Sequence, residues 1–341
     1  MTSPLVSVVI PTHQRRQLLR RALVALAGQD LSADVFEVVV AVDRATDSTE
    51  EMLEEFQAPY ALRWVRAIRP GRAAACNAAI AAARGEIIVM LDDDMEPRPG
   101  LLRHHYGSHP RGSRRCLVGA VPIRLDRDSP PAARYVAAKF ADHLDVLGRP
   151  GHEFGLRDFY SGNASIRRDV LLAVGAFDEQ FTLYGNEDLE LSLRLRKAGV
   201  ELRFSADAAA EQRYTKSLAG LAEDTFAKGK TAVQLASTHP AAFDGLHLAA
   251  YDSVSGRWSG TRAVLLAVAR RWPHARRWIL RLALGLERLP CLRRILYYRF
   301  VLDYFYWAGV QAALTDQTPS GRLAVLAADL HRGPIRLLLH R

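Results

Sequence analysis

Short apolar runs alternate with helix-like stretches through the first third of the chain. Four apolar runs have the length of strands: 5–10, 36–42, 62–68 and 87–91. Helices are predicted between them from apolar spacing and composition, at 18–26, 48–56 and 72–84. Near-continuous apolar strands are typical of a parallel sheet whose two faces are both covered. The predicted fold class is therefore α/β, with a mostly parallel central sheet and helices on both faces. The first strand is expected to stop at Pro11.

The second half of the chain is less regular. Residues 122–160 are rich in Pro, Gly and charge, and we expect loops around one helix there. Residues 189–198 alternate apolar and polar positions, a spacing that also suits a strand. Acidic residues just before this segment, basic residues at its end and Gly199 beyond it favour a helix.

Length and composition predict an ordinary folded protein of two parts. The chain has 341 residues, and we expect an α/β domain at 1–240 followed by a basic, amphipathic helical region at 241–341. Its three cysteines are widely separated and form neither a disulfide framework nor a metal-ligand spacing, which suits a reducing cytosol. We expect no signal segment and no membrane-spanning helix, because no long uncharged apolar stretch occurs.

Three consecutive aspartates follow the fourth apolar run directly. Asp92, Asp93 and Asp94 repel one another, so their loop is costly unless a cation or dense hydrogen bonding offsets the repulsion. A divalent ion such as Mg2+ or Mn2+ takes oxygen ligands and bridges carboxylates to substrate phosphates. The alternative is a solvated acidic turn before the next helix, since two prolines and Gly100 follow. The buried strand before the triplet favours a site that binds a metal and a diphosphate.

Other polar residues also follow predicted strands. Pro11 and Thr12 follow the first strand, Asp43 ends the second, and the aspartate triplet ends the fourth. Ligands of open parallel sheets bind at the carboxyl ends of the strands. We therefore expect one crevice to collect these residues.

Seven segments, in order and at similar spacing, carry a resemblance to a known family. They are 6–12, 42–49, 71–77, 85–94, 162–164, 175–178 and 187–188. The set resembles glycosyltransferase family 2, whose members are inverting enzymes with the GT-A fold. The resemblance covers residues 4–235, and no catalytic motif is recognised beyond residue 240.

The resemblance implies a role for each site residue. Asp43 is expected to hydrogen-bond the base of a UDP-, GDP- or dTDP-sugar. Asp92 and Asp94 form the Asp-x-Asp motif, which touches the ribose and a Mg2+ or Mn2+ ion on the diphosphate. Asp188 is expected to be the general base for the acceptor hydroxyl, and Glu187 to bind the acceptor and raise the pKa of Asp188. The other expected nucleotide-sugar ligands are Pro11, Thr12, Arg72, Asn77 and Asp93. The residues expected near the donor or acceptor sugar are Gly162 and Asn163.

One departure concerns the metal site. Many family members place a histidine just after the strand that follows the acceptor helix. The corresponding segment here, 208–214, has no histidine, and Gln212 stands at its position. Either Glu211 or Gln212 substitutes for it, or the metal relies on Asp94, phosphates and water.

The C-terminal part is strongly basic. The net charge of the chain is +9, and residues 257–299 contain eleven arginines and one acid, Glu287, interleaved with Trp, Leu and Ile. This pattern favours amphipathic helices on an anionic membrane surface. Packing onto the first domain is the main alternative, and nucleic acid fits less well because aliphatic residues accompany the aromatics. We therefore expect a membrane surface bound through residues 257–300, no nucleic acid, and a peripheral location on the cytoplasmic face.

The predicted function is metal-dependent, inverting transfer of a sugar from a nucleotide sugar to a lipid-linked, polysaccharide or other glycan acceptor. A nucleotidyltransferase is one alternative, but it usually has a Gly-rich phosphate loop after the first strand. The basic segment 13–16 has no glycine. A non-catalytic glycan- or lipid-binding relative is expected to lose the aspartate triplet or Asp188, and both are present.

Overall fold

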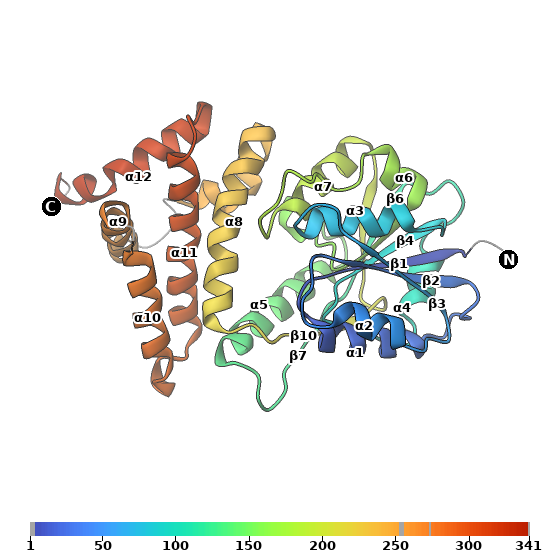
Figure 1. Ribbon diagram of the computed structural model, residues 1–341. Coiled ribbons are helices and arrows are strands. Elements are labelled where there is room, and N and C mark those ends of the chain that lie inside the picture. Colours follow the sequence, from blue (N-terminus) through green and yellow to red (C-terminus); the bar gives the residue numbers. More distant parts are fainter. Residues whose placement is uncertain (1–3, 252–255, 273, 340–341) are drawn as a thin grey trace. The chain divides into compact units, whose positions relative to one another are not determined.

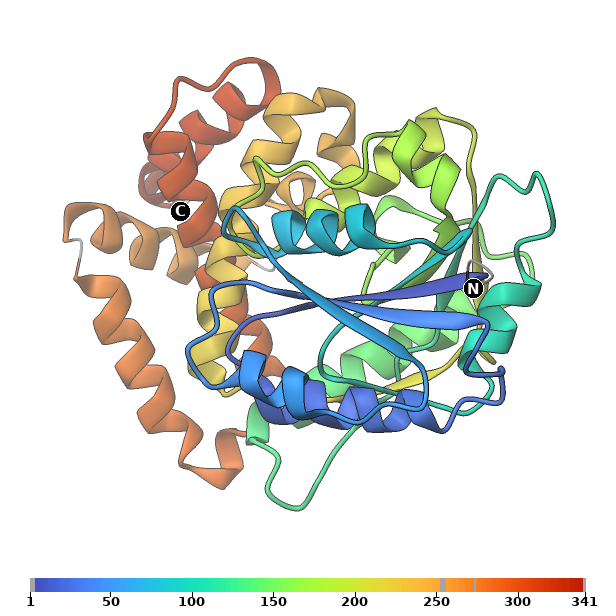
Figure 2. The same ribbon diagram turned by 45° about the vertical axis from the view of Figure 1, so that its right-hand side comes forward.

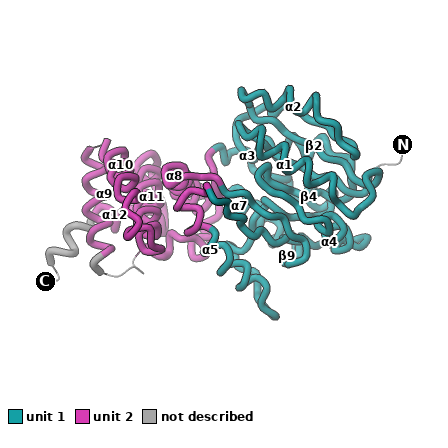
Figure 3. The backbone as a smooth tube through the Cα atoms, turned by 90° about the horizontal axis from the view of Figure 1, so that it is seen from below, with its two compact units in different colours: residues 1–127, 137–182, 187–214 teal, residues 128–136, 183–186, 215–341 magenta. Residues whose placement is uncertain are grey.

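The computed structural model describes residues 4–251, 256–272 and 274–339 (Figure 1). Contacts divide the chain into two compact units (Figure 3). The first unit comprises residues 1–127, 137–182 and 187–214, and the second comprises 128–136, 183–186 and 215–341. The division into a domain at 1–240 and a helical region at 241–341 stays a prediction.

A seven-stranded sheet forms the centre of the first unit, in the order β3-β2-β1-β4-β8-β6-β9. Its strands are β1 (Val6–Thr12), β2 (Phe36–Val42), β3 (Ala61–Arg66), β4 (Ile87–Leu91), β6 (Arg115–Gly119), β8 (Asn163–Arg167) and β9 (Glu201–Ser205). The first four strands run parallel, β6 is parallel to β9, and only β8 is antiparallel to its neighbours. The predicted mostly parallel sheet is confirmed.

Strand β1 differs from the prediction at its end, because it continues through Pro11 to Thr12. Proline lacks the N–H group that a strand with two neighbours uses. Pairing of β1 with β4 ends at Val9, whereas pairing with β2 continues to Thr12. Pro11 therefore lies where the strand has one neighbour, and Thr12 still extends the strand toward the edge of the sheet.

Successive residues of each central strand point to opposite faces, and both faces are buried. Val8, Val38 and Val89 pack with one set of helices, α1 (Arg16–Ala27), α2 (Thr49–Glu55) and α4 (Leu101–Gly107). Val9 and Val39 pack with the other set, α3 (Arg72–Ala82), α6 (Arg168–Ala173) and α7 (Glu187–Lys197). Figures 1 and 2 show helices on both sides of the sheet. The helix predicted near 189–198 is thus confirmed as α7, and the one expected within 122–160 is α5 (Pro131–Leu147).

A small second sheet lies next to the aspartate triplet. It consists of β5 (Met95–Pro97), β10 (Ala210–Arg213) and β7 (Ile123–Arg124), with β10 in the middle. In its register Gln212 lies opposite Met95. Gln212 is thereby placed beside the residue that directly follows Asp94.

The second unit is helical. Its helices are α8 (Leu218–Thr238), α9 (Gly256–Arg271), α10 (Ala275–Glu287), α11 (Ile295–Thr315) and α12 (Gly321–Leu339), with short 3-10 turns η2 (Pro240–Gly245), η3 (His247–Ala250) and η4 (Pro290–Leu292). Helices α8 and α11 pack closely through Gly229 and Gly309. A Cβ atom at Gly309 would collide with the carbonyl oxygen of Phe226. Among the described residues, no helix is both long and apolar enough to cross a bilayer.

A buried ion pair organises the interior of the second unit. Arg262 is 1% exposed and contacts Asp303 at 3.1 Å. The indole nitrogens of Trp258 and Trp307 also donate hydrogen bonds to Asp303, at 2.7 and 3.1 Å. Trp258 stacks on Phe300 as well, with ring centroids 4.5 Å apart. Part of the basic, aromatic sequence pattern therefore serves internal packing.

Candidate active site

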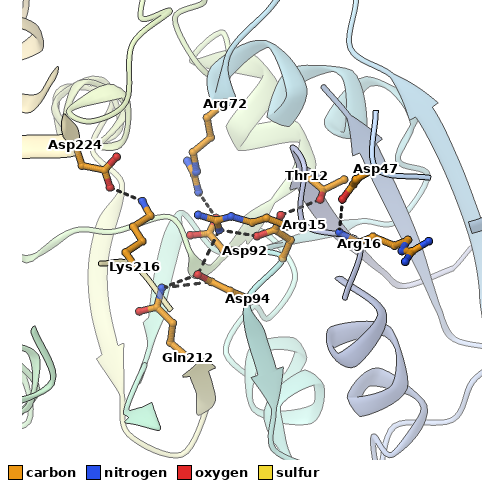
Figure 4. Close-up of polar contacts among 11 residues, drawn as sticks. Thr12, Arg15, Arg16, Asp47, Arg72, Asp92, Asp94, Gln212, Lys216 and Asp224 are labelled. Carbon is orange, nitrogen blue, oxygen red and sulfur yellow. Dashed lines mark hydrogen bonds and ion pairs between the residues drawn. The ribbon is translucent and has the colours of Figure 1, made fainter. Parts of the chain in front are cut away.

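The aspartate triplet lies in the loop between β4 and β5, at the carboxyl edge of the sheet. Asp93 is 4% exposed and Asp94 is 9% exposed, whereas Asp92 is partly exposed. A solvated acidic turn is therefore excluded. Buried carboxylates require compensating hydrogen bonds or charges, and four side chains supply them (Figure 4).

The first two of these side chains come from the end of β1 and the start of α1. Thr12 Oγ1 donates a 2.8 Å hydrogen bond to Asp93. One guanidinium nitrogen of Arg15 lies 2.9 Å from Asp93 and 3.3 Å from Asp94. Arg15 is thus an internal counter-ion for two of the three carboxylates, and it was not among the predicted site residues. In the sequence, Arg15 belongs to the basic segment 13–16, which directly follows the first strand. That strand, β1, pairs with β4, the strand that leads to the triplet.

Gln212 is the third compensating side chain. Its amide nitrogen lies 3.3 and 3.2 Å from the two carboxylate oxygens of Asp94. Glu211 instead pairs with Arg98 at 3.0 Å. Of the two residues considered as replacements for the missing histidine, Gln212 is therefore the one directed at Asp94.

The carboxyl group of Asp94 is electrostatically unfavourable in its ionised form. Burial raises its pKa to about 7, and the charges of Asp92 and Asp93 act in the same direction. Burial also raises the pKa of Asp93, although Arg15 opposes the shift. Positive charge brought to this loop would relieve the repulsion that remains.

Arg72, the fourth compensating side chain, links the triplet to helix α7. One terminal nitrogen of Arg72 donates to Asp92 at 2.6 Å. The other nitrogen lies 3.0 Å from Ser161 Oγ and 3.4 Å from Glu187 Oε1. The guanidinium also lies 6.0 Å from the centroid of the Phe177 ring. Arg72 therefore bridges the loop after β4 and the first residue of α7, a role beyond the predicted contact with the donor.

Helix α7 begins with the two predicted acidic residues. Glu187 is buried beside Arg72, and Asp188 is partly exposed. Asp188 Oδ1 accepts a 2.8 Å hydrogen bond from the backbone N–H of Leu189. Acidic side chains in the first turn also complement the helix dipole. Glu187 thus joins the polar network around the triplet through Arg72.

Asp43 lies at the end of β2 and is buried. Its carboxylate accepts from the backbone N–H of Gly71 at 2.9 Å and from Arg44 at 3.2 Å. Gly71 has a φ of 105°, a conformation that residues with a side chain rarely adopt. Asp43 thus fixes the turn that leads directly to Arg72.

Two predicted ligands have side chains occupied by structural contacts. The side-chain amide of Asn77 donates hydrogen bonds to the carbonyl oxygen of Phe177 and to Glu179, and it accepts one from the backbone N–H of Phe177. Asn163 is fully buried, and its amide nitrogen donates to the carbonyl oxygens of Ala120 and Ala208. These asparagines support loops near the site. The predicted sugar or nucleotide contacts for both side chains stay untested.

Gly162 allows close packing against the triplet. A Cβ atom at this position would lie 2.6 Å from Asp92 Oδ2. The Gly162 carbonyl also accepts a 3.0 Å hydrogen bond from the backbone N–H of Asp92. This glycine therefore holds the triplet loop without filling the space beside it.

The carboxylate oxygens of the triplet are ligands of the type that a hard divalent cation takes. Three adjacent carboxylates supply oxygen atoms, the ligands that Mg2+ and Mn2+ take. Within the described residues, no group of three or more His, Cys, Asp or Glu side chains is arranged as a complete metal cage. An ion held by one or two carboxylates plus substrate phosphates does not need such a cage. Asp92 and Asp94 fit this kind of site.

Comparison with solved structures establishes the fold class. The mannosyltransferase PcManGT from Pyrobaculum calidifontis, solved in complex with GDP-Man and Mn2+, aligns with a TM-score of 0.58 and 22% sequence identity. The alignment covers 93% of this chain and 89% of that chain. The GT-A class implied by the sequence resemblance is thereby confirmed, as are the helices at the C-terminus.

Sequence comparison defines the family. Residues 7–175 match the family described as Glycosyl transferase family 2, and this part of the chain belongs to that family. The uncharacterized glycosyltransferase YfnE of Bacillus subtilis is 28% identical over 247 residues, which are 59% of this chain and 62% of YfnE. The validoxylamine A glucosyltransferase of Streptomyces hygroscopicus subsp. jinggangensis is 30% identical over 228 residues, 60% of this chain and 54% of that enzyme. The chain thus matches less than two thirds of the length of these relatives.

Proposed function

We propose that this protein transfers a glycosyl group from a nucleotide-sugar donor to a hydroxyl group of a glycan or lipid-linked acceptor. The observation that carries the proposal is the network around Arg72, which joins Asp92 of the triplet to Glu187 of helix α7. The aspartate loop, to which we assign the donor, and an acidic helix terminus are thereby linked by one side chain. Membership of residues 7–175 in glycosyltransferase family 2 supports the same activity.

The donor is proposed to bind with its base near Asp43 and its diphosphate at the aspartate triplet. Asp92 and Asp94 would hold a Mg2+ or Mn2+ ion, which would neutralise charge on the leaving nucleoside diphosphate. Arg15 supplies positive charge beside Asp93 and Asp94, and Arg72 orients Asp92. The donor class is a UDP-, GDP- or dTDP-sugar.

The acceptor step is assigned to the start of α7. Asp188 accepts the proton of the acceptor hydroxyl while that oxygen attacks the anomeric carbon, and the nucleoside diphosphate leaves from the opposite side. A single displacement of this kind inverts the anomeric configuration and forms no covalent intermediate with the protein. Glu187, anchored by Arg72, orients the acceptor. We further propose that residues 1–240 suffice for this chemistry and that the basic C-terminal region binds the cytoplasmic face of a membrane.

The released product tests the proposal directly. The protein is incubated with Mg2+ or Mn2+ and a panel of UDP-, GDP- and dTDP-sugars, and free nucleotides and pyrophosphate are quantified. A glycosyltransferase releases a nucleoside diphosphate from one donor class. In a parallel sample with added pyrophosphate, its consumption with release of a nucleoside triphosphate and a sugar phosphate would instead identify a nucleotidyltransferase. Donor binding without turnover, across a panel of glycan and lipid acceptors, would identify a non-catalytic relative.

A further inference from the structure

Helix α10 and the turn η4 carry an unusual exposed apolar surface. Trp278 and Leu282 are 54% and 64% exposed. Leu286 in α10, Leu289 directly after it, Leu292 in η4, and Ile295 and Leu296 at the start of α11 are exposed as well. Single exposed apolar residues are normal on a soluble protein, whereas a contiguous set marks an interaction surface.

Helical spacing puts these residues on one stripe. At 3.6 residues per turn, Trp278, Leu282, Leu286 and Leu289 fall on the same side of α10 and its continuation. Arg277, Arg281 and Arg288 follow the same spacing along one flank of the stripe, and all three are exposed. The guanidinium of Arg281 lies 4.8 Å from the centroid of the Trp278 ring. The surface therefore combines a lipophilic stripe with a basic border.

Two small residues of α10 pack within its own unit. Ala275 and Ala283 are buried. Tyr297 donates a hydrogen bond to the carbonyl oxygen of Ala283, and Tyr298 donates one to Glu287 at 3.1 Å. These bonds tie α10 to the start of α11 (Figure 1). Helix α10 is thus fixed to α11, while the large apolar side chains of the stripe stay exposed.

The charge of this surface selects its partner. Glu287 is the one acid between 275 and 299, and it contacts Tyr298. Arginines beside Trp and Leu match an anionic bilayer, where aliphatic side chains enter the acyl boundary and guanidinium groups meet phosphate. Nucleic acid offers no apolar phase for the leucines. Trp258 and Arg262, which the sequence pattern included in the membrane surface, contact Asp303 inside the unit instead.

We propose that α10 and η4 form a membrane-insertion element, in which Trp278, Leu282, Leu286 and Leu289 enter an anionic lipid surface. This narrows the membrane contact predicted for residues 257–300 to one helix and the turn after it. The inference deepens the proposed membrane location but does not depend on catalysis. Interfacial helices of this kind bury their apolar face about 5–10 Å into the headgroup and acyl boundary.

A native cysteine permits a direct test of insertion. Cys291 lies in η4 and is exposed, whereas Cys76 and Cys116 are buried. An environment-sensitive fluorophore attached to Cys291 should shift to the blue with vesicles of phosphatidylcholine and phosphatidylglycerol in equal parts. Pure phosphatidylcholine should give little shift, and high salt should reduce the response to the mixed vesicles. No blue shift with the anionic vesicles would overturn the proposal.

Substitutions separate insertion from charge attraction. The double variant Leu282→Gln/Leu286→Gln should weaken vesicle binding on the order of tenfold or more, because two large apolar groups no longer leave water. The matched control is Val325→Gln on α12, which replaces a residue that is 61% exposed and should bind as the unmodified chain does. Each Arg277→Gln or Arg281→Gln substitution should weaken binding roughly fivefold at low salt.

Two results would point elsewhere. If the leucine variants bind vesicles normally and only the arginine variants fail, the contact is electrostatic and the insertion is disproved. If the protein self-associates without lipid, and Leu282→Gln/Leu286→Gln abolishes this association but leaves vesicle binding unchanged, the stripe is an interface between copies. Turnover of a nucleotide sugar in solution is measured in parallel. Insertion without any turnover would contradict the proposed enzyme while supporting this element.

Discussion

Arg72 donates a 2.6 Å hydrogen bond to Asp92, so the first residue of α3 is tied to the loop that follows β4. The same guanidinium reaches Glu187 through its other terminal nitrogen. A planar guanidinium with several donors can serve two carboxylates at once, whereas a lysine ammonium is a compact point charge. The position of the loop that carries the aspartate triplet is therefore coupled to that of helix α7, and lysine would replace Arg72 poorly.

Arg72→Lys tests this coupling. We expect kcat/KM to fall on the order of tenfold to a hundredfold, since the charge remains but one of the two contacts is lost. The matched control is Arg63→Lys, which alters an arginine that pairs with Glu37 away from the triplet and should leave donor affinity unchanged. Equal donor affinity and turnover in Arg72→Lys and the unmodified chain would contradict the coupling.

Asp188→Asn tests the proposed general base. Asparagine keeps the shape of the side chain but cannot accept the proton from the acceptor. Turnover should fall on the order of 10²–10⁴-fold, while donor affinity measured by calorimetry changes little. Glu187→Gln is the comparison one residue away. Near-normal turnover in Asp188→Asn together with an inactive Glu187→Gln would move the base to Glu187.

The sequence predicted the central elements well, because strand and helix periodicity is local. It also predicted that the triplet needs compensation, since three adjacent like charges repel regardless of fold. The identity of the compensating groups was not predictable from local pattern. Arg15 is distant from Asp93 in sequence and reaches it because β1 and β4 are neighbours in the sheet.

The asparagines show a second limit of sequence reasoning. Asn163 fits a family motif, yet its amide is enclosed between two backbone carbonyls. A motif specifies the residue type, while the packing around it decides which atoms remain available to a ligand. Gln212 illustrates the converse. Sequence left it as one of two substitutes for a histidine, and the pairing of β10 with β5 places it beside Asp94.

Two buried histidines predict a pH dependence of stability. Burial lowers the pKa of His105 and of His109 to about 4, below the value of about 6.5 expected in the unfolded chain. Both are therefore neutral in the folded protein near pH 5, while the unfolded chain binds protons. Above pH 6.5 the histidines do not change the free energy of unfolding with pH. As pH falls from 6.5 toward 4 the free energy of unfolding decreases, by about 2 kcal/mol per histidine at pH 5.

Urea unfolding of His109→Gln at pH 7.5 and pH 5 isolates this effect. The glutamine amide can still donate to Ser165 Oγ, the partner of His109 Nε2 at 2.7 Å, but it does not titrate. The raised pKa of Asp94 acts in the opposite direction, because its protonation at low pH relieves repulsion in the folded state. Asp94 is present in both proteins, so its effect cancels in the comparison. Identical pH dependence of the two proteins would contradict the assignment of a neutral, buried His109.

The crossing of α8 and α11 predicts a contrast between two glycines. At Gly309 a Cβ atom would collide with the backbone of α8 at Phe226, so Gly309→Ala must separate the helices. We expect a loss of at least 1–3 kcal/mol in the free energy of unfolding, roughly the cost of overpacking. Gly285→Ala on α10 is the control, because no heavy atom lies within 4 Å of its Cβ position. It should stabilise the protein by about 0.5–1 kcal/mol, and equal effects at both sites would disprove the close crossing.

Asp94 provides the most direct test of the central claim, that the aspartate triplet is the donor site of a metal-dependent glycosyltransferase. Nucleoside diphosphate release is measured for the unmodified chain and for Asp94→Ala, with Mg2+ or Mn2+ and with a chelator. We expect release from one class of nucleotide sugar by the unmodified chain, loss of release with the chelator, and none from a folded Asp94→Ala. Undiminished, metal-independent release by Asp94→Ala would contradict it.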